Sequence, residues 1–372
     1  MSKNIGVFSK NDLVKMVENG RLIPCVGFDM DHINTASVDL TSTGEAYTLK
    51  TLLQPSQIQD ETVRELLPFM EATRIELGAV LDVGSTTITK ASLEVNFPPS
   101  VYGYLNAKSS SGRCFVFARS LADRQNMFDS ADRRRNGYSG ELWIVIQPLA
   151  FPIVFTNKER YDQLRIFNGD TRFKQKDLDD LLLDHDLLYR RETQEPYKHS
   201  ELSLFTDDGS ILCTLHAPVN KIIGYRCKKG SLAVDLTKRN LDPKDYFEPV
   251  YAEEKIINGK TISFVKVEGG YYYLLSTNEI LKVPDTHTAE LVALDTRLGF
   301  FFSHFAGFFD NGFFGTATLE IFSPFTIWLR HKQPVARFVF EKLRSKAPSY
   351  KEKGTYQSQI ETQLPKQFLS WK

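Results

Sequence analysis

The segment Ala306–Pro324, AGFFDNGFFGTATLEIFSP, is the most informative stretch of this 372-residue chain. It overlaps a Phe-rich run, with eight phenylalanines between Phe300 and Phe314. The glycines within this run predict β-strands joined at a tight bend. Glu320 lies among these apolar residues. Because desolvation disfavours a charged carboxyl, we expect the pKa of Glu320 to be raised, so that the group can lend and recover a proton near neutral pH. The alternative is a solvent-facing glutamate on an edge strand.

Composition favours an ordinary globular protein of two domains. The hydrophobic content of 42% and the charged content of 25% are typical of folded domains, and the length is sufficient for two. The formal net charge is zero, whereas general nucleic-acid binding depends on an excess of Lys and Arg. The N-terminus lacks an apolar stretch of signal-peptide length, and no run reaches membrane-spanning length. We therefore expect a cytoplasmic protein that binds neither nucleic acid nor membrane.

The cysteines give no indication of a metal site. Cys25, Cys114, Cys213 and Cys227 form no C-x-x-C pair, and the H-x-E…P-C-x-x-C set of zinc deaminases is absent from the sequence. Scattered cysteines of this kind fit reduced structural thiols. We expect no zinc and no other metal held by protein side chains.

The order of patterns along the chain predicts a mainly β fold with a few short helices. Ser9 can cap a helix over Lys10–Asn19, with Asp12 in the capping-box position and Gly20 as its stop. Leucines and charges over Lys176–Glu192 indicate a second short helix or an ordered linker. Strands are expected over Ile33–Leu40, Gly78–Val101, Phe151–Phe155, Asp162–Phe167, Tyr271–Leu275 and the ELSLF, SILCTL and GYRCKKGSLAVDL segments.

We place a domain boundary within the segment Lys176–Glu192, after residue 190. The predicted domains cover residues 1–190 and 191–347, and a C-terminal tail covers residues 348–372. The tail is polar and has few aliphatic residues. We therefore expect it to stay outside a core and to become ordered against something else.

The segment Tyr104–Arg113, YLNAKSSSGR, is a polar loop unlike its surroundings. Its hydroxyls, backbone N–H groups and guanidinium suit phosphate oxygens, since Arg can bind two oxygens at once and loop amides form an anion nest. A solvated serine-rich turn is the alternative interpretation. A charged insertion over Asp123–Arg135 separates this loop from the next strand. The candidate phosphate-binding residues are Lys108, Ser109, Ser110, Ser111, Gly112 and Arg113.

Two segments repeat one another, GYSGELWIVIQP in the first half and GFFGTATLEIFSP in the second. When Gly137 is overlaid on Gly312, Val145 takes the place of Glu320. Upstream, KSSSGR overlays DTRLGF, which contains Gly299. The first copy holds the serine loop and the second holds the acidic residues. We therefore predict a duplicated β-unit whose site lies where the two copies meet.

Taken together, these motifs resemble the dCTP deaminase family of the dUTPase-like superfamily. The resemblance rests on TASVDL, KSSSGR, GYSGELW…QPLAFPI, GYRCKK…VDL…DPKDYFEP, AGFFDNGFFGTATLEI and TYQSQ…LPKQF, in this order over nearly the whole chain. It implies two tandem distorted jelly-roll β-domains and a homo-oligomer, such as a trimer, around a threefold axis. It also implies hydrolysis of the 4-amino group of dCTP to give dUTP and ammonia without a catalytic metal, with Mg²⁺ accompanying the triphosphate.

The resemblance also implies roles for individual residues. Glu320 matches the catalytic glutamate of the family, and Asp310 matches the acid that holds the deoxyribose 3′-hydroxyl. Lys108 to Arg113 match the loop that binds phosphates and orders the attacking water, and the backbone of Ala306 matches a strand position that reads the base. Further substrate contacts are implied for Thr318, Leu319, Tyr350, Tyr356 and Gln359, the last three in a tail that closes over the triphosphate.

Three positions depart from the family pattern. Thr355 stands where many single-domain members have a lysine, although Lys351 and Lys353 are close enough to substitute. Val145 replaces a carboxylate often present in the first domain, so we assign that domain no general acid. TASVDL lacks the arginine that usually follows it, and we interpret its Asp39 as structural.

Other functions stay open at this point. A dUTP pyrophosphatase needs an Asp-bearing turn, which Asp310 could supply, and a glycine-rich phosphate-binding tail, which YKEKGTYQSQIETQ does not supply. A bifunctional enzyme that releases dUMP and a non-catalytic nucleotide-binding homologue are further alternatives. The joint presence of Glu320, Asp310, Arg113 and the serines argues against the non-catalytic homologue. The sequence leaves the product, the oligomeric state and inhibition by dTTP undetermined.

Overall fold

The computed structural model of the protein describes residues 5–202, 204–205, 209–294, 306–350 and 354–372. The expected fold class is confirmed, because the chain is mainly β and forms several antiparallel sheets. Two stretches named above, DTRLGF with Gly299 and the pair Lys351 and Lys353, lie outside the described residues. None of the helices in the described parts has the length and apolar character needed to cross a bilayer.

The chain forms two compact units, and each of them is discontinuous in sequence. Unit 1 consists of Met1–Thr171, Ser231–Arg239 and Lys342–Pro348, and unit 2 consists of Arg172–Gly230, Asn240–Glu341 and Ser349–Lys372. The second half of the chain therefore contributes two short segments to unit 1. The predicted domain ranges, divided after residue 190, stay a prediction, and a cut there would separate both segments from the rest of unit 1.

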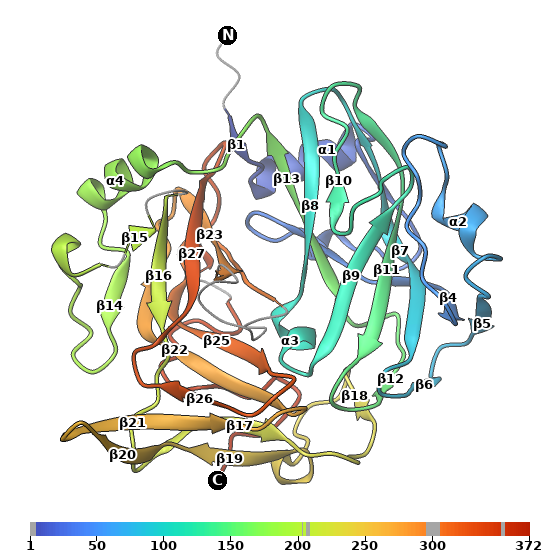
Figure 1. Ribbon diagram of the computed structural model, residues 1–372. Coiled ribbons are helices and arrows are strands. Elements are labelled where there is room, and N and C mark those ends of the chain that lie inside the picture. The colour runs from blue at the N-terminus through green and yellow to red at the C-terminus, as the bar shows by residue number, and fades with distance from the viewer. Residues whose placement is uncertain (1–4, 203, 206–208, 295–305, 351–353) are drawn as a thin grey trace. The chain divides into compact units, whose positions relative to one another are not determined.

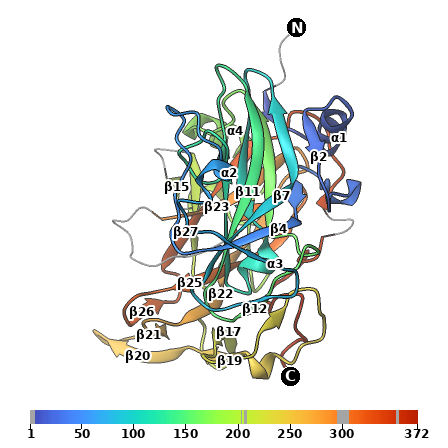
Figure 2. The same ribbon diagram turned by 90° about the vertical axis from the view of Figure 1, so that its right-hand side faces the viewer.

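Unit 1 contains two larger sheets, in the strand orders β1-β13-β8-β10 and β5-β4-β7-β11-β9, with β3 paired to β13 and β2 to β7. Strands β7, β11 and β9 lie side by side in Figure 1, and Figure 2 shows β7 and β11 from another side. The elements of this unit are β1 (Gly6–Val7), α1 (Lys10–Glu18), β2 (Leu22–Pro24), η1 (Met30–His32), β3 (Val38–Leu40), β4 (Ser42–Leu49), α2 (Val63–Leu66), β5 (Thr73–Ile75), β6 (Val80–Leu81), β7 (Thr86–Phe97), β8 (Val101–Ala107), α3 (Ser109–Gly112), β9 (Val116–Ala122), β10 (Ser130–Ala131), β11 (Tyr138–Pro148), β12 (Ile153–Val154), β13 (Asp162–Asn168) and β18 (Val234–Asp235).

Local sequence accounts for the first helix. Ser9 is the N-cap residue of α1, and its backbone N–H donates to the Asp12 carboxylate at 3.2 Å, as the capping box predicts. Asn19 caps the C-terminal end of the helix, and Gly20 follows with a φ of +64°, which glycine adopts without steric conflict. The helix prediction is therefore confirmed. The strand expected over Ile33–Leu40 is shorter than predicted, because regular pairing begins only at Val38.

Two segments from late in the chain complete unit 1 by backbone pairing. Strand β18 pairs in parallel with β12, so that Val234 lies opposite Ile153. In the other segment, the Arg344 N–H donates to the Val7 carbonyl at 2.8 Å, and Ser345 Oγ donates to the Asp12 carboxylate at 2.6 Å. Such contacts between residues far apart in sequence are not visible in the local pattern of the chain.

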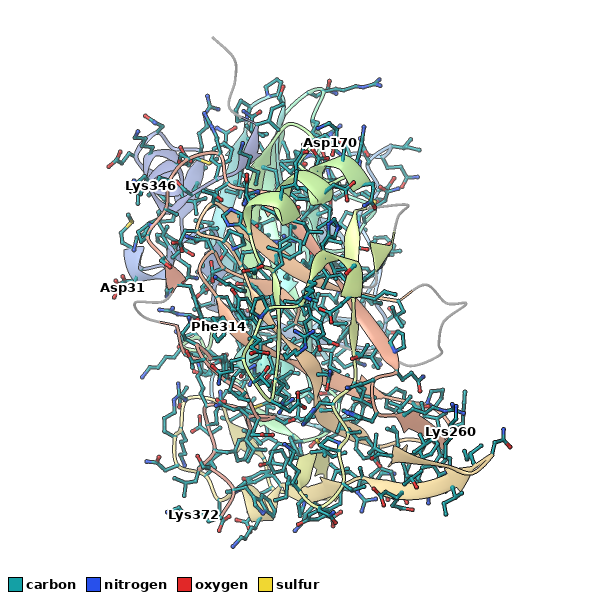
Figure 3. The ribbon with its side chains drawn as sticks, turned by 90° about the vertical axis from the view of Figure 1, so that its left-hand side faces the viewer. Asp31, Asp170, Lys260, Phe314, Lys346 and Lys372 are labelled. Carbon is teal, nitrogen blue, oxygen red and sulfur yellow. The ribbon has the colours of Figure 1, made fainter. Side chains whose placement is uncertain are left out.

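Unit 2 contains three sheets. Their strand orders are β14-β22-β17-β19, β15-β16-β27-β23-β24 and β20-β21-β26, and β25 also pairs with β22 of the first sheet. The last of these carries a two-residue hairpin turn at Asn258 and Gly259, both with positive φ, and Lys260 in Figure 3 marks its position. The elements are α4 (Gln175–Asp184), β14 (Leu188–Arg190), η2 (His199–Glu201), β15 (Leu204–Phe205), β16 (Ser210–Thr214), β17 (Ile222–Cys227), η3 (Pro243–Asp245), β19 (Phe247–Tyr251), β20 (Glu253–Ile257), β21 (Lys260–Val267), β22 (Tyr272–Lys282), β23 (His287–Ala293), β24 (Phe308–Phe309), β25 (Phe314–Phe322), β26 (Ile327–Arg330) and β27 (Pro334–Lys342).

The predicted repeat appears in the strand pairing of the two units. In unit 1, β11 pairs antiparallel with β7, and in unit 2, β25 pairs antiparallel with β22. The partial order β13-β8-β10 in unit 1 corresponds to β27-β23-β24 in unit 2. Gly137 and Gly312, overlaid in the sequence, have φ values of +79° and +81°. A glycine with a positive φ therefore precedes the corresponding strand in both units, and glycine is needed there because other residues rarely adopt this φ.

Candidate active site

The serine segment of unit 1 is a helical turn rather than an irregular loop. It follows β8 directly, and α3 begins at Ser109. The Gly112 N–H donates to the Lys108 carbonyl at 2.8 Å, and the Arg113 N–H donates to the Ser109 carbonyl at 3.0 Å. The first N–H groups of such a turn have no acceptor within the turn itself. The helical turn therefore still offers backbone N–H donors suited to an anion, which is the property that made this segment a phosphate-binding candidate.

The ammonium group of Lys108 already has partners within unit 1. Its Nζ lies 2.8 Å from an Asp39 carboxylate oxygen and donates to Gln163 Oε1 at 3.2 Å. Asp39 is buried and also binds the Arg160 guanidinium at 2.9 Å and the Asn34 amide at 2.7 Å. These contacts support the interpretation of Asp39 as structural. A phosphate group would have to compete with Asp39 for the Lys108 ammonium.

The serine turn is largely buried. Ser110, Ser111 and Arg113 are buried, and the Ser111 hydroxyl donates to the Glu159 carboxylate at 3.2 Å. The alternative of a solvated serine-rich turn is therefore wrong. Ser109, at the start of the turn, is only half-buried.

Glu320 lies on β25, on the face opposite the core of unit 2. Alternation along the strand places Ala317, Leu319 and Ile321 in that hydrophobic core and sends Glu320 to the other face. Its exposed fraction is 1%, so the solvent-facing alternative is wrong. The side chain of Leu319 is occupied by core packing, which leaves its backbone as the part that could contact a ligand.

Thr318 shares a face of β25 with Glu320, two residues away. Its hydroxyl is buried and has no hydrogen-bond partner among the described residues. Across the sheet, Ser276 of β22 lies directly opposite Thr318. An unsatisfied buried hydroxyl is unfavourable by about 1–3 kcal/mol, so a ligand that bonds to it would gain that amount.

A tight turn leads into β25. The Phe313 N–H donates to the Asp310 carbonyl at 3.2 Å, and Gly312 occupies the position of the turn that requires a positive φ. The Asp310 side chain is half-buried just before the strand, and Ala306 is buried at the start of the segment. The predicted arrangement of strands around a tight bend is therefore confirmed.

The C-terminal tail lies against the beginning of β25. The Thr316 N–H donates to the Gln359 carbonyl at 2.9 Å, and the buried Gln359 amide donates to the Thr316 carbonyl. A Cβ atom on Gly315 would lie 3.0 Å from the Gln359 carbonyl oxygen, so glycine permits this close approach. Gln359 is thus held on the strand that carries Thr318 and Glu320.

The two tail tyrosines lie on the same side of unit 2 as that turn. The Tyr350 N–H donates to the Asn311 carbonyl at 2.9 Å, and its ring lies 6.0 Å from that of Phe313. The Tyr356 N–H donates to the Tyr350 hydroxyl at 3.5 Å, and its own hydroxyl accepts from the Lys366 N–H at 3.3 Å. Tyr350, Tyr356 and Gln359 therefore all lie on unit 2 and are linked to the turn and strand that precede Glu320.

Aromatic residues of the tail pack on unit 2. The Phe368 ring lies 5.1 Å from that of Tyr246 and 5.2 Å from that of Phe247, and its exposed fraction is 9%. Trp371 lies 5.6 Å from the Tyr225 ring. The expectation that the tail stays outside the core is therefore wrong, because its contacts are made by aromatic rather than aliphatic side chains.

Two family models match the chain. That of the 2'-deoxycytidine 5'-triphosphate deaminase (DCD) N-terminal domain matches residues 4–170, and that of the C-terminal domain matches residues 184–368. The chain belongs to the dCTP deaminase family. It is also similar to the crystal structure of 2'-deoxycytidine 5'-triphosphate deaminase from Agrobacterium tumefaciens, with 26% identity and a TM-score of 0.80 over 93% of this chain and 100% of that one. Among curated proteins, no sequence matches it.

Within this dCTP deaminase family member, the first copy of the repeat has a different surface at the position that corresponds to Glu320. Val145 is buried in a cluster with Trp143, also of β11, and with Leu66 and Met70 from α2 and the turn after it. The Arg64 guanidinium lies 5.2 Å from the centre of the Trp143 ring. A helix of the chain itself therefore covers this face of β11, which supports the assignment of no general acid to the first domain.

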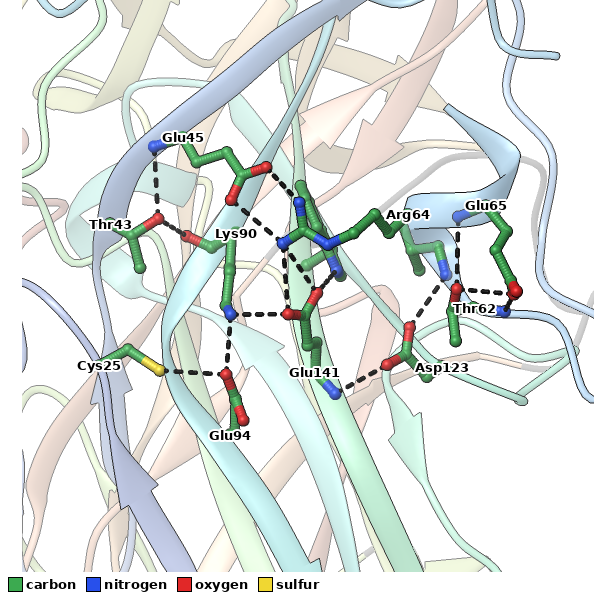
Figure 4. A network of polar contacts seen from close by, with 12 residues as sticks. Cys25, Thr43, Glu45, Thr62, Arg64, Glu65, Lys90, Glu94, Asp123 and Glu141 are labelled. Carbon is green, nitrogen blue, oxygen red and sulfur yellow. Dashed lines mark hydrogen bonds and ion pairs between the residues drawn. The ribbon is translucent and has the colours of Figure 1, made fainter. Parts of the chain in front are cut away.

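A network of charges surrounds this covered face (Figure 4). Arg64 binds Glu45 at 2.7 Å and Glu141 at 3.2 Å, and Lys90 binds both Glu141 and Glu94 at 2.7 Å. Burial by itself would raise the pKa of Glu141, but hydrogen bonds from Lys90 and Arg64 outweigh burial and hold that pKa below its ordinary value. Glu45, Glu94 and Glu141 therefore each have a cationic partner.

Arg191 carries no recognisable motif in the sequence, yet it is buried and binds the tail. Its neighbour Arg190 is only partly buried and makes an ordinary ion pair to Glu201, and nothing in the local sequence distinguishes the two arginines. Among the described residues, no group of three or more His, Cys, Asp or Glu side chains could hold a metal ion.

Proposed function

We propose that this protein catalyses the hydrolytic deamination of dCTP to dUTP and ammonia, with Glu320 as the group that moves protons. Membership of the dCTP deaminase family supports the reaction. The single observation that supports Glu320 most strongly is its burial on β25, on the polar face shared with the hydroxyl of Thr318. In the overlaid position of the first copy, Val145 has no titratable group and is covered by α2.

One carboxyl can serve each proton transfer of this reaction in sequence. The Glu320 carboxylate takes a proton from water as the oxygen bonds to C4 of the cytosine, and it passes that proton to N3. The carboxylate then takes the remaining proton from the new C4 hydroxyl and gives it to the 4-amino group. The C4–N bond breaks, ammonia leaves and the carbonyl of the uracil forms, so dCTP and water are converted to dUTP and ammonia. No redox partner is needed.

The substrate contacts remain proposals drawn from the family pattern. We assign the triphosphate, accompanied by Mg²⁺ as part of the substrate, to Lys108–Arg113, Tyr350, Tyr356 and Gln359. Asp310 holds the 3′-hydroxyl, and the backbones of Ala306 and Leu319, with the Thr318 hydroxyl, contact the nucleoside. The hydrogen bond between Thr316 of β25 and Gln359 places the tail beside the strand that carries Glu320, which supports a role of the tail in binding the substrate.

An assay on purified full-length protein tests the proposal. Incubation with dCTP and Mg²⁺ should release ammonia and dUTP, identified by chromatography of the nucleotides. A zinc-selective chelator should not stop the reaction while Mg²⁺ is in excess. Formation of dUMP and pyrophosphate from dCTP would indicate a bifunctional enzyme. Turnover of dUTP with none of dCTP would overturn the deaminase assignment in favour of a pyrophosphatase.

A complementation assay tests whether Arg113 and Glu320 belong to the same working site. We expect Arg113→Ala and Glu320→Gln proteins each to be inactive. If one chain supplies both groups, mixed and reassembled oligomers of the two variants stay inactive, which is the result that we expect because a fused chain keeps both groups at high effective concentration. Recovery of activity on mixing would show that neighbouring chains of a homo-oligomer supply them.

A further inference from the structure

Two adjacent arginines, Arg190 and Arg191, have very different surroundings in unit 2. The side chain of Arg190 is 30% exposed and binds Glu201, whereas the side chain of Arg191 is 3% exposed. Burying a guanidinium is unfavourable unless its donors are matched by acceptors. The acceptors that Arg191 uses therefore indicate why the chain tolerates it there.

The Arg191 guanidinium joins strand β22 to the tail. Its Nη1 donates to Ser276 Oγ at 3.0 Å and to the Thr277 carbonyl at 2.9 Å, and its Nη2 donates to the Glu361 carboxylate at 2.8 Å. Burial lowers the pKa of Arg191, and the charge of Glu361 opposes that effect. The buried cation thus depends on a carboxylate that the tail supplies.

A second contact fixes the tail at the same place. The Thr362 hydroxyl is buried and lies 2.9 Å from Ser276 Oγ, and it donates to the Ile223 carbonyl at 2.8 Å. Ser276 therefore contacts both Arg191 and the tail. Because Glu361 and Thr362 are consecutive, the two contacts together fix both the position and the direction of this part of the tail.

This group of contacts adjoins the proposed active-site strand. Ser276 lies directly opposite Thr318 across the β22–β25 pair, and Thr318 is two residues before Glu320. Gln359, two residues before Glu361, is bonded to Thr316 of the same strand. The Arg191 contacts therefore hold the tail where it reaches the polar face of β25.

We propose that Arg191 is a positioning residue for the nucleotide-binding tail, and that it sets the affinity for the triphosphate substrate without taking part in proton transfer. This inference rests on the proposed function, because it needs dCTP as the ligand that the tail covers. Arg191 fixes residues 359–362 on unit 2. This contact limits where the preceding tail residues Tyr350 and Tyr356 can lie.

Steady-state kinetics of the full-length protein with Mg²⁺ and dCTP test the inference. In Arg191→Met, which keeps an unbranched stem and removes the donors, we expect KM to rise about tenfold or more, since a hydrogen bond to a charged group contributes about that much. We expect kcat to change by less than about threefold, because the proton-transfer group is untouched. Arg191→Lys should recover part of the lost affinity, because its ammonium can bind either strand β22 or the Glu361 carboxylate but cannot bridge them as the guanidinium does.

The neighbouring Arg190→Met variant is the matched control, because it makes the same substitution one residue away at a side chain that is only partly buried. It should keep both kinetic constants of the wild type. Glu361→Gln is the second variant, and it guards against a folding defect in Arg191→Met, since the Glu361 side chain is 58% exposed. It should raise KM about threefold, in the same direction as Arg191→Met.

The outcomes separate the inference from the proposed function. Unchanged KM in both Arg191→Met and Glu361→Gln, with an active wild type, would overturn the positioning role alone. A fall in kcat without a rise in KM would also overturn it, because Arg191 would then act on the chemical step. A wild type that does not deaminate dCTP would overturn the proposed function, and the inference with it.

Discussion

The overlaid faces of β11 in unit 1 and β25 in unit 2 come from one repeated segment but have opposite chemistry. On β11 the positions hold Glu141, Trp143 and Val145, and α2 packs over the last two. On β25 the corresponding positions hold Thr316, Thr318 and Glu320. The face of β11 is thus filled by apolar side chains of the chain itself, whereas the face of β25 keeps a buried hydroxyl and a buried carboxyl.

Magnitudes indicate which contacts hold α2 in place. The ion pairs of Arg64 are partly exposed, with 47% of its side chain accessible, and such pairs contribute about 0.2–1 kcal/mol each. Burying a Leu or Met side chain contributes about 1.5–3 kcal/mol, and Leu66 and Met70 are both buried on Trp143 and Val145. Apolar packing therefore dominates, and the charged network orients the helix. One duplicated face is thus a closed structural core, and the other holds the buried polar groups that we propose for the chemistry.

The largest effect should come from the carboxyl that distinguishes the two faces. Glu320→Gln keeps shape and hydrogen-bonding capacity but cannot cycle a proton, so we expect kcat to fall at least ~100-fold while dCTP still binds. Ammonia release measures kcat, and calorimetric titration measures binding. The control is Glu141→Gln on the face of β11, which should stay within about twofold of wild-type turnover. Near wild-type turnover in Glu320→Gln would remove the functional difference between the faces.

Placing a carboxyl on the closed face tests the comparison in reverse. Val145→Glu would put an unpaired carboxyl beside Leu66 and Met70, and we expect the free energy of unfolding to fall by about 3 kcal/mol. Denaturant unfolding measures this loss. Val145→Ile, which stays apolar, should change stability by less than about 1.5 kcal/mol. A stable Val145→Glu protein with increased turnover would indicate that the first copy retains a usable site.

Substitutions in the tail test how much it contributes to the stability of unit 2 and to dCTP binding. Phe368→Ala removes a ring packed against Tyr246 and Phe247, so we expect stability to fall by about 2 kcal/mol, with a lower Tm. The neighbouring Leu369 is 48% exposed, and Leu369→Ala should stay within about 0.5 kcal/mol of the wild type. Deletion of residues 348–372 should weaken dCTP binding and also destabilise unit 2. A truncated protein with wild-type Tm and affinity would contradict both roles of the tail.

The smallest effect concerns the charges around the covered face. Arg64→Met keeps much of the stem over Trp143 and removes the ion pairs, so we expect a loss of about 1 kcal/mol at low ionic strength. The difference from wild type should shrink in about 1 M NaCl, where the screening length is only about 3 Å. Leu66→Ala should instead lose stability at both ionic strengths. A salt-independent loss in Arg64→Met would mean that packing of its stem, and not charge, accounts for its contribution.

The sequence by itself determined the features that depend on near neighbours. The capping box of Ser9 and Asp12, the positive-φ glycines Gly137 and Gly312 and the alternation along β25 are all set by residues a few positions apart. Fold class, the repeat and family membership follow from such motifs in their order. The contrast between Val145 and Glu320 was also readable, since one side chain can titrate and the other cannot.

Tertiary structure alone decided which of two adjacent arginines is buried, which face of the repeat is closed, and which late segments complete unit 1. Arg191 differs from Arg190 because Ser276 and Glu361 come to meet it, and Val145 is covered because α2, more than seventy residues earlier, packs on β11. The tail likewise joins unit 2 through Phe368 and Gln359 despite its polar composition. These outcomes depend on contacts between residues distant in sequence, whose energies are set by burial and partner geometry in the folded chain rather than by local preference.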